Sequence, residues 1–237
     1  MAQFVFIHGP GAGGCADSYV HQLRHFPGSV APNLPGHLTG SPCDDVQRYT
    51  DWLRGWLWGQ GHQQDLVLMG FTLGACIALQ YALDYPEEVQ ALVLMTVAMR
   101  PKERKPDTLE FRIRASQDPT VYQQWKDSMG HGMMFIEPEL RDHLLKCHDQ
   151  VGPLSQHQDL VTIDRFDARD RISSLQAPLL LIRGVDDPGE PPEYELEIHQ
   201  AVPGSQYLKL DNAGHFPMAE RPEDVNRAIE EFLAALS

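Results

Sequence analysis

Residues 70–74 of the chain have the sequence Gly70-Phe71-Thr72-Leu73-Gly74, and this stretch decides the fold. An apolar segment with strand character precedes it at 65–69, and an apolar segment with helical character follows it at 75–84. A strand that turns into a helix over a G-x-T-x-G sequence has the form of a nucleophile elbow. Both glycine positions need small residues, because the turn is tight and the helix packs close to the strand. The pattern predicts that the Thr72 hydroxyl lies at the carboxyl edge of a sheet, above a helix N-terminus.

Short apolar segments alternate with longer amphipathic segments on both sides of this turn, as is typical of a parallel α/β sheet. Beyond residues 65–69, strands are predicted at 4–8, 29–32, 89–97, 178–182 and 205–210. Further helices are predicted at 16–26, 46–58 and 222–236. From Lys102 to about Ile163 the sequence is charged, rich in methionine and helical, with no strand pattern. We therefore expect a core formed by residues 1–100 and 165–237 and a helical cap at 101–164.

The composition of the 237 residues limits the class of protein. Hydrophobic residues make up 42%, enough for a sizeable core, and no apolar run approaches the ~20 residues of a membrane span. The 19 basic and 33 acidic residues give a net charge of −14, which disfavours binding to nucleic acid or to an anionic membrane surface. Four scattered cysteines and the lack of a signal-peptide pattern indicate a cytoplasmic protein with free thiols. We expect a small-molecule substrate, and the oligomeric state stays open.

Two other predicted strand ends carry residues suited to catalysis. Asp186 and Asp187 follow the strand at 178–182, and His215 lies in a glycine-bearing loop after the last strand. The carboxyl ends of parallel strands share one edge of a sheet, so these side chains are expected near Thr72. A hydroxyl residue followed along the chain by an acid and then a histidine is the order of a hydrolytic triad on an open α/β sheet.

Four further segments carry a resemblance to a known family. His8-Gly9 after the first strand resembles an oxyanion-loop HG, and residues 33–37 (NLPGH) resemble a D-x-P-G-H segment. Residues 85–89 (YPEEV) with 92–94 (LVL), and residues 212–215 (NAGH) with 220–223 (ERPE), match the segments expected after the elbow helix and around the histidine. Apart from the cap, the whole chain resembles the α/β-hydrolase fold superfamily. It starts directly at the strand before His8, as in the small esterase and hydroxynitrile-lyase branches.

This resemblance implies an α/β fold of three layers, with a mostly parallel sheet of about six strands and a helical cap. It also implies a hydrolase of small carboxylic esters or lactones that needs no metal or organic cofactor. Thr72 would be the nucleophile, His215 the general base and then acid, and Asp187 the residue that orients His215, since Asp187 fits the family spacing G-x-x-D better than Asp186 does. The expected oxyanion and substrate-binding residues are Leu73, Gly11, Pro10 and Gly9, and the expected cap residues around an apolar acyl pocket are Trp125, Met129, Met133 and Phe135.

Two departures from the family pattern leave the reaction open. The family normally has Ser, Asp or Cys where this chain has Thr72, and a β-branched residue is strained at positive φ and crowds the acyl carbon. Pro10 stands where a backbone N–H normally serves the oxyanion hole, and loss of one such donor has cost roughly 10²–10³ in rate elsewhere. Base chemistry without an acyl-enzyme, as in hydroxynitrile lyases and cofactor-free dioxygenases, is therefore an alternative. A non-catalytic binding protein of the same fold is another.

Three competing interpretations have less support. Residues 9–14 fit the dinucleotide pattern G-x-G-x-x-G, but residues 29–33 offer no acid to hold a ribose. No lysine follows these glycines, so a phosphate-binding loop of the Walker type is also absent. Cys76 lies one helical turn beyond Thr72, and at that spacing we expect it in the packing between helix and sheet rather than as a nucleophile.

Overall fold

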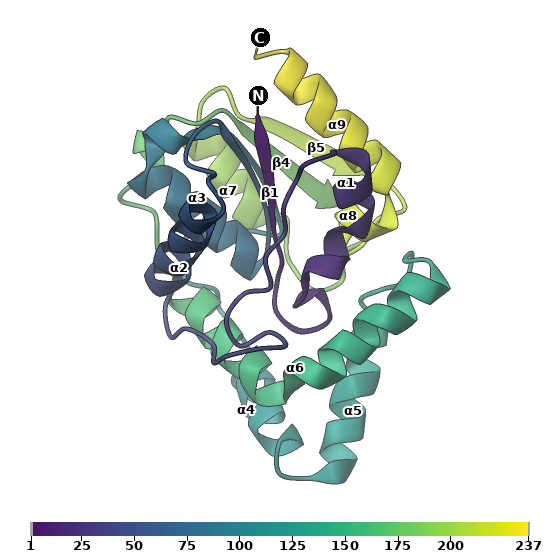
Figure 1. Cartoon of the computed structure of the whole chain (residues 1–237). Coiled ribbons are helices and arrows are strands. Elements are labelled where there is room, and N and C mark those ends of the chain that lie inside the picture. Colours follow the sequence, from purple (N-terminus) through teal and green to yellow (C-terminus); the bar gives the residue numbers. More distant parts are fainter. Residues whose placement is uncertain (1, 237) are drawn as a thin grey trace.

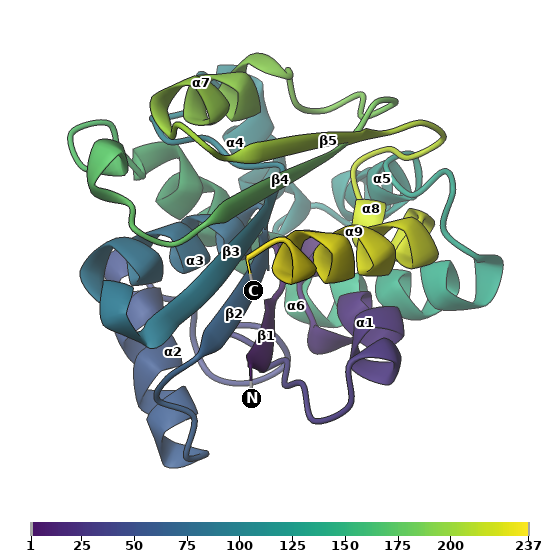
Figure 2. The same cartoon turned by 90° about the horizontal axis from the view of Figure 1, so that it is seen from above.

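In the computed structural model, which describes residues 2–236, five parallel strands form one sheet (Figure 1). Their order is β1-β2-β3-β4-β5, as Figure 2 shows. The strands are β1 (Gln3–Ile7), β2 (Leu66–Phe71), β3 (Val89–Met95), β4 (Leu179–Gly184) and β5 (Gln206–Leu210). The α-helices are α1 (Val20–His25), α2 (Val46–Gly59), α3 (Leu73–Asp84), α4 (Pro106–Ala115), α5 (Pro119–Gly130), α6 (Pro138–Arg165), α7 (Glu193–Ala201), α8 (Pro217–Glu220) and α9 (Pro222–Ala234).

Helices cover both faces of the sheet, and this explains why the strands are apolar throughout. In β2, Leu66 and Leu68 pack into a core cluster shared with α2 and α3. Val67 and Met69 point to the other face, into a cluster that includes side chains of α9. Figure 2 shows α2 and α3 on one side of the sheet and α1 and α9 on the other. A sheet buried on both faces needs apolar residues at every position rather than at alternate ones. The architecture is the three-layer α/β-hydrolase fold expected from the sequence.

Three local differences from the sequence-based expectation have simple causes. The strand expected at 29–32 is a single bridge between Val30 and Val5, because Pro32 has no N–H to extend a ladder, and the sheet has five named strands. The helix expected at 16–26 begins as a 3₁₀ turn, Ala16–Tyr19, before α1. Helix α7, which follows β4, was not predicted from the sequence, because the proline-rich segment 188–192 that precedes it resembles a loop.

Helices α4, α5 and α6 follow one another along the chain with no strand between them. They pack on one another beyond the carboxyl ends of the strands (Figure 1). Helix α6 also contacts the core through its second half, where the fully buried Asp159 accepts hydrogen bonds from Tyr49 (2.8 Å) and His37 (2.7 Å). Within residues 2–236, no helix combines the length and the apolar character that crossing a membrane would require.

Candidate active site

Thr72 occupies a sharp turn between β2 and α3, with φ 48° and ψ −107°. A Cβ on Gly70 would overlap the backbone of Gly74, and a Cβ on Gly74 would overlap the carbonyl of Ile7. Both glycines are therefore required by the close approach of strand and helix. The Thr72 N–H donates to the Met95 carbonyl at 3.1 Å, which fixes the turn to β3. A positive φ at a β-branched residue is strained and persists only where the surrounding structure holds it.

Asp187 and His215 come together from the ends of β4 and β5. The Nδ1 of His215 lies 2.8 Å from Oδ2 of Asp187, and the Gly189 N–H donates to Oδ1 of the same carboxylate at 2.8 Å. Burial acts to raise the pKa of Asp187, but the hydrogen bond and charge of His215, with help from Gly189 and Arg183, bring this pKa below its usual value. Asp187 is thus an anion hydrogen-bonded to the imidazole. The neighbouring Asp186 is exposed.

Glu220 holds the loop that carries His215. Its carboxylate accepts the N–H of Gly214 at 2.6 Å and the N–H of Phe216 at 3.3 Å, the two amides on either side of the histidine. Burial raises the pKa of Glu220 above its usual value, while those two amides act against the shift. Glu220 stands in the ERPE segment noted in the sequence, but that segment alone gave no role to the residue.

The Thr72 hydroxyl lies against the glycine-rich loop rather than against His215. Its Oγ1 is buried and has no hydrogen-bond partner in the described part of the chain. A Cβ on Gly9 would overlap this oxygen, which places the hydroxyl next to the backbone of Gly9. His215 and Thr72 nevertheless line the same cavity. Catalytic hydrogen bonds are often long or unmade before substrate is bound.

The backbone around Thr72 offers few donors for a developing negative charge. Leu73 is the first residue of α3, and its N–H meets no acceptor among residues 2–236. Pro10 lines the cavity but has no N–H, and Gly11 follows it at φ +65°. A Cβ on Gly11 would overlap Nε2 of Gln156, so the loop packs directly on α6. The free Leu73 N–H is therefore one donor directed at the region of Thr72.

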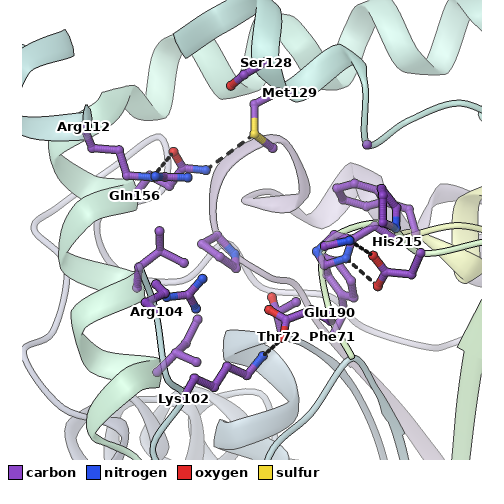
Figure 3. Close-up of a pocket in the computed structure, with 18 residues that line it drawn as sticks. Phe71, Thr72, Lys102, Arg104, Arg112, Ser128, Met129, Gln156, Glu190 and His215 are labelled. Carbon is purple, nitrogen blue, oxygen red and sulfur yellow. Dashed lines mark hydrogen bonds and ion pairs between the residues drawn. The ribbon is translucent and has the colours of Figure 1, made fainter. Parts of the chain in front are cut away.

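These side chains surround a cavity of about 220 Å³. Thr72, Asp187 and His215 line it, and side chains of helices α4, α5 and α6 form another part of its wall. Figure 3 shows Arg112 and Ser128 on the side away from Thr72. The cavity is smaller than the ~300–1,000 Å³ of sites that hold drug-sized ligands, so it suits a small molecule.

Comparison with known proteins assigns the family. A sequence profile of the alpha/beta hydrolase family matches residues 4–228. The chain belongs to the alpha/beta hydrolase family.

Relatives within the family differ in the reactions that they are named for. The carbamate hydrolase candidate RutD of Klebsiella pneumoniae is 28% identical over 182 residues, which cover 71% of this chain and 66% of RutD. This chain therefore spans about two thirds of that relative. An esterase from Thermogutta terrifontis has a TM-score of 0.82 at 23% identity, over 99% of this chain and 90% of the other. An enol-lactonase from Burkholderia xenovorans has a TM-score of 0.84 at 17% identity, over 99% and 92%. The chain is an alpha/beta hydrolase enzyme whose reaction class these names leave open.

Of the four cap residues predicted for the pocket of this hydrolase, the structure places one in the cavity wall. Met129 lines the cavity. Trp125 is fully buried against the His148 ring, and its indole N–H donates to Gln156 at 2.6 Å. Met133 is buried in a core cluster, and Phe135 is 40% exposed. These three residues do not line the cavity. Met133 and Phe135 lie in the loop between α5 and α6, and apolar character alone does not tell which side chains face a cavity.

Several polar residues of the cavity wall were missed in the sequence. They are Lys102, Arg104, Arg112, Gln156 and Glu190. The segment from 101 to 164 is charged throughout, so nothing distinguished the first four side chains from solvated ones, and Glu190 lies in a proline-rich loop that resembles a solvated turn. Cys76 is buried in the core, as predicted.

One group of residues could offer ligands to a metal ion. The ligand atoms of Cys15, Asp17 and Cys147 lie within 4.8 Å of one another, and none of these residues lines the cavity. Burial raises the pKa of both thiols, that of Cys15 strongly, and so disfavours the thiolate that a metal would bind.

Proposed function

We propose that the protein hydrolyses small carboxylic esters or lactones, with Thr72 as nucleophile, His215 as general base and then acid, and Asp187 as the residue that orients His215. The observation that carries the proposal is the 2.8 Å contact between His215 Nδ1 and Asp187 Oδ2. Both residues line the same cavity as the strained elbow residue Thr72. The esterase, lactonase and carbamate hydrolase named among the relatives act on acyl groups, which agrees with this reaction.

In the first step, His215 takes the proton of the Thr72 hydroxyl through its free Nε2 as Oγ1 attacks the carbonyl carbon of the ester. The charge that forms on the carbonyl oxygen is stabilised by the N–H of Leu73, with the N–H of Gly11 as the second donor in place of Pro10. Collapse of this intermediate breaks the bond to the alcohol, which takes the proton from His215. Water, deprotonated by His215, then releases the acid from Thr72. Helices α4 to α6 act as the cap that shields these steps.

Substitutions at Thr72 test this mechanism. Thr72→Ser keeps the hydroxyl and removes the methyl group that crowds the acyl carbon, so hydrolysis of p-nitrophenyl esters should rise about 10-fold. Thr72→Ala should be inactive, and a fluorophosphonate should label Thr72 in the parent protein. Thr96 offers a matched control, because it is another buried threonine at positive φ (53°) and does not line the cavity. Thr96→Ser should leave turnover unchanged. Slower hydrolysis by Thr72→Ser on every ester would contradict the nucleophilic role.

A second candidate is base chemistry by His215 without an acyl-enzyme. The absence of a hydrogen bond from Thr72 to His215 favours it, as does the missing N–H at Pro10. In that case neither Thr72 variant hydrolyses esters and Thr72→Ala keeps part of the native turnover, whereas His215→Ala abolishes it. If substitutions at Thr72 and His215 leave the affinity for a ligand unchanged and no turnover is found, the protein is a non-catalytic binding protein.

A further inference from the structure

The cavity wall carries more positive charge than the rest of this acidic chain would suggest. Lys102, Arg104 and Arg112 all line the cavity, on the side away from His215 (Figure 3). The net charge of the whole chain is −14, so three basic side chains around one small cavity stand out. The question is whether carboxylates of the protein neutralise them.

Two of the three cations have an acidic partner and the third has none. Lys102 pairs with Glu190 at 2.9 Å, and Arg104 pairs with Asp164 at 2.7 Å. Arg112 forms no ion pair with any residue in the range 2–236. Asp164 is the acid whose charge reaches Arg112. Among the described residues, Asp164 is therefore the single carboxylate near both guanidinium groups, and its one negative charge neutralises only one of their two positive charges.

The unpaired positive charge of Arg112 is energetically unfavourable, because the side chain is partly buried. Burial, and then the charge of Arg104, lower the pKa of Arg112 to about 10. Arg112 is still a cation at neutral pH, but one that has lost much of its hydration. A partly buried charge without a counter-ion is unfavourable, and a bound anion would relieve that cost.

The hydrogen bonds of Arg112 leave one terminal nitrogen of its guanidinium group, Nη2, without an acceptor in the described chain. Its Nε donates to Oε1 of Gln156 at 2.8 Å, and Nη1 donates to the Thr108 carbonyl. Nη2 meets no acceptor in the described chain, nor do the two terminal nitrogens of Arg104, which holds Asp164 through Nε. Gln156 is in turn fixed by the indole N–H of Trp125, so it acts as a positioning residue for Arg112. The free donors belong to two arginines that line the same cavity.

We propose that Arg112, assisted by Arg104, is an anion subsite that binds a free carboxylate on the substrate, so that the enzyme hydrolyses a small ester or lactone bearing a second, ionised carboxyl group. This inference rests on the proposed function for the reaction at Thr72. The free terminal nitrogens of Arg112 and Arg104 can donate together to the two oxygens of one carboxylate, and a guanidinium group suits this acceptor better than the ammonium group of a lysine does. The small volume of the cavity restricts the carboxylate to a position a few bonds from the reacting carbonyl.

A pair of matched esters tests the subsite. The p-nitrophenyl monoester of succinic acid carries a carboxylate, and the p-nitrophenyl ester of succinamic acid has the same shape without the charge. The parent enzyme should show a kcat/KM at least 10-fold higher for the acid than for the amide. Arg112→Gln should bring the ratio close to one, because it should lower kcat/KM for the acid at least 10-fold more than kcat/KM for the amide. Arg112→Lys should recover only part of the preference.

Arg114→Gln is the matched control, because Arg114 lies on the same helix but is exposed and does not line the cavity. It should keep the full preference for the acid. An equal rate on both esters in the parent, or an equal loss on both in Arg112→Gln, would overturn the subsite while leaving ester hydrolysis intact.

If the parent hydrolyses neither ester, the proposed function fails, and calorimetric binding of succinate then decides the subsite separately. Succinate should bind to the parent and at least 10-fold more weakly to Arg112→Gln. Equal binding to both would overturn the subsite. Inorganic phosphate that binds more tightly than succinate would overturn the assignment to carboxylate.

Discussion

Thr72 combines two unfavourable features, a positive φ and a buried hydroxyl without a partner. The G-x-T-x-G spacing predicted the strained turn correctly, because the overlaps at Gly70 and Gly74 are backbone geometry that follows from the motif. It did not predict where the hydroxyl points. That depends on the contact with Gly9, a residue 63 positions earlier in the sequence, which a local pattern does not contain.

Replacement of Thr72 by the isosteric valine should leave the protein as stable as the parent or more so. The change removes an unsatisfied hydroxyl and breaks no hydrogen bond, and an unsatisfied buried polar group costs about 1–3 kcal/mol. Urea denaturation should thus give a free energy of unfolding equal to or above that of the parent, together with loss of ester hydrolysis. A decrease of more than about 1 kcal/mol would mean that the hydroxyl has a partner in solution.

Helix α6 illustrates how much the sequence determined at the level of an element. The absence of strands between 101 and 164 was predicted from charge and periodicity, and helices α4 to α6 occupy that range. The division of α6 was not predicted. Gly152 interrupts it with φ 81° and ψ 164°, a conformation open essentially to glycine, and Pro153 begins the second half. Sequence alone did not distinguish this break from a flexible position in a continuous helix.

Gly152→Ala should lower the free energy of unfolding by about 1–3 kcal/mol. No atom lies within 4 Å of the added Cβ, so the whole effect is backbone strain. Gly55 is the control, because it lies inside α2 with equally open surroundings and no positive φ. Gly55→Ala should raise the stability by about 0.5–1 kcal/mol, through the higher helix propensity of alanine. Equal effects of the two substitutions in thermal unfolding would exclude strain at Gly152.

The contact between α6 and the core depends on Asp159. Asp159→Ala leaves the His37 imidazole and the Tyr49 hydroxyl without their buried acceptor, and should lower the free energy of unfolding by about 3 kcal/mol. Asp142 provides the comparison, as an exposed acid in the same helix, and Asp142→Ala should change the stability by less than about 0.5 kcal/mol. A small effect at Asp159 would show that water replaces the missing carboxylate.

At the scale of the whole molecule, two buried histidines link stability to pH. His8 accepts the Leu34 N–H on Nε2, which keeps its ring neutral, and burial lowers its pKa well below the usual value. His148 has no hydrogen-bond partner within residues 2–236, and burial together with the charge of Arg112 lowers its pKa to about 3. Neither histidine was singled out for this property in the sequence, because burial at 0% exposure is a result of the fold.

Stability should therefore fall as the pH is lowered from about 6.5 toward 3. In this range the unfolded chain binds a proton at His148 that the folded chain does not, so this residue alone contributes a loss of about 1.4 kcal/mol per pH unit. His148→Phe keeps the ring contact with Trp125 and should reduce the slope by that amount in urea titrations between pH 6 and 4. His131→Gln, at an exposed position, should not change the slope. An unchanged slope in His148→Phe would mean that His148 is protonated in the fold.

The anchoring of α6 through Asp159 also determines how a substrate reaches the cavity. The second half of this helix is hydrogen-bonded to the core, whereas α4 and α5 pack mainly on each other and on α6, so we expect α4 and α5 to be the more mobile part of the cavity wall. Local opening draws on the segments with the fewest buried contacts. Amide hydrogen exchange in α4 and α5 should be faster than in residues 155–165 of α6, and a succinate monoester should slow it in α4 and α5 alone. Equal exchange in all three helices would mean that α6 is no more rigid than α4 and α5.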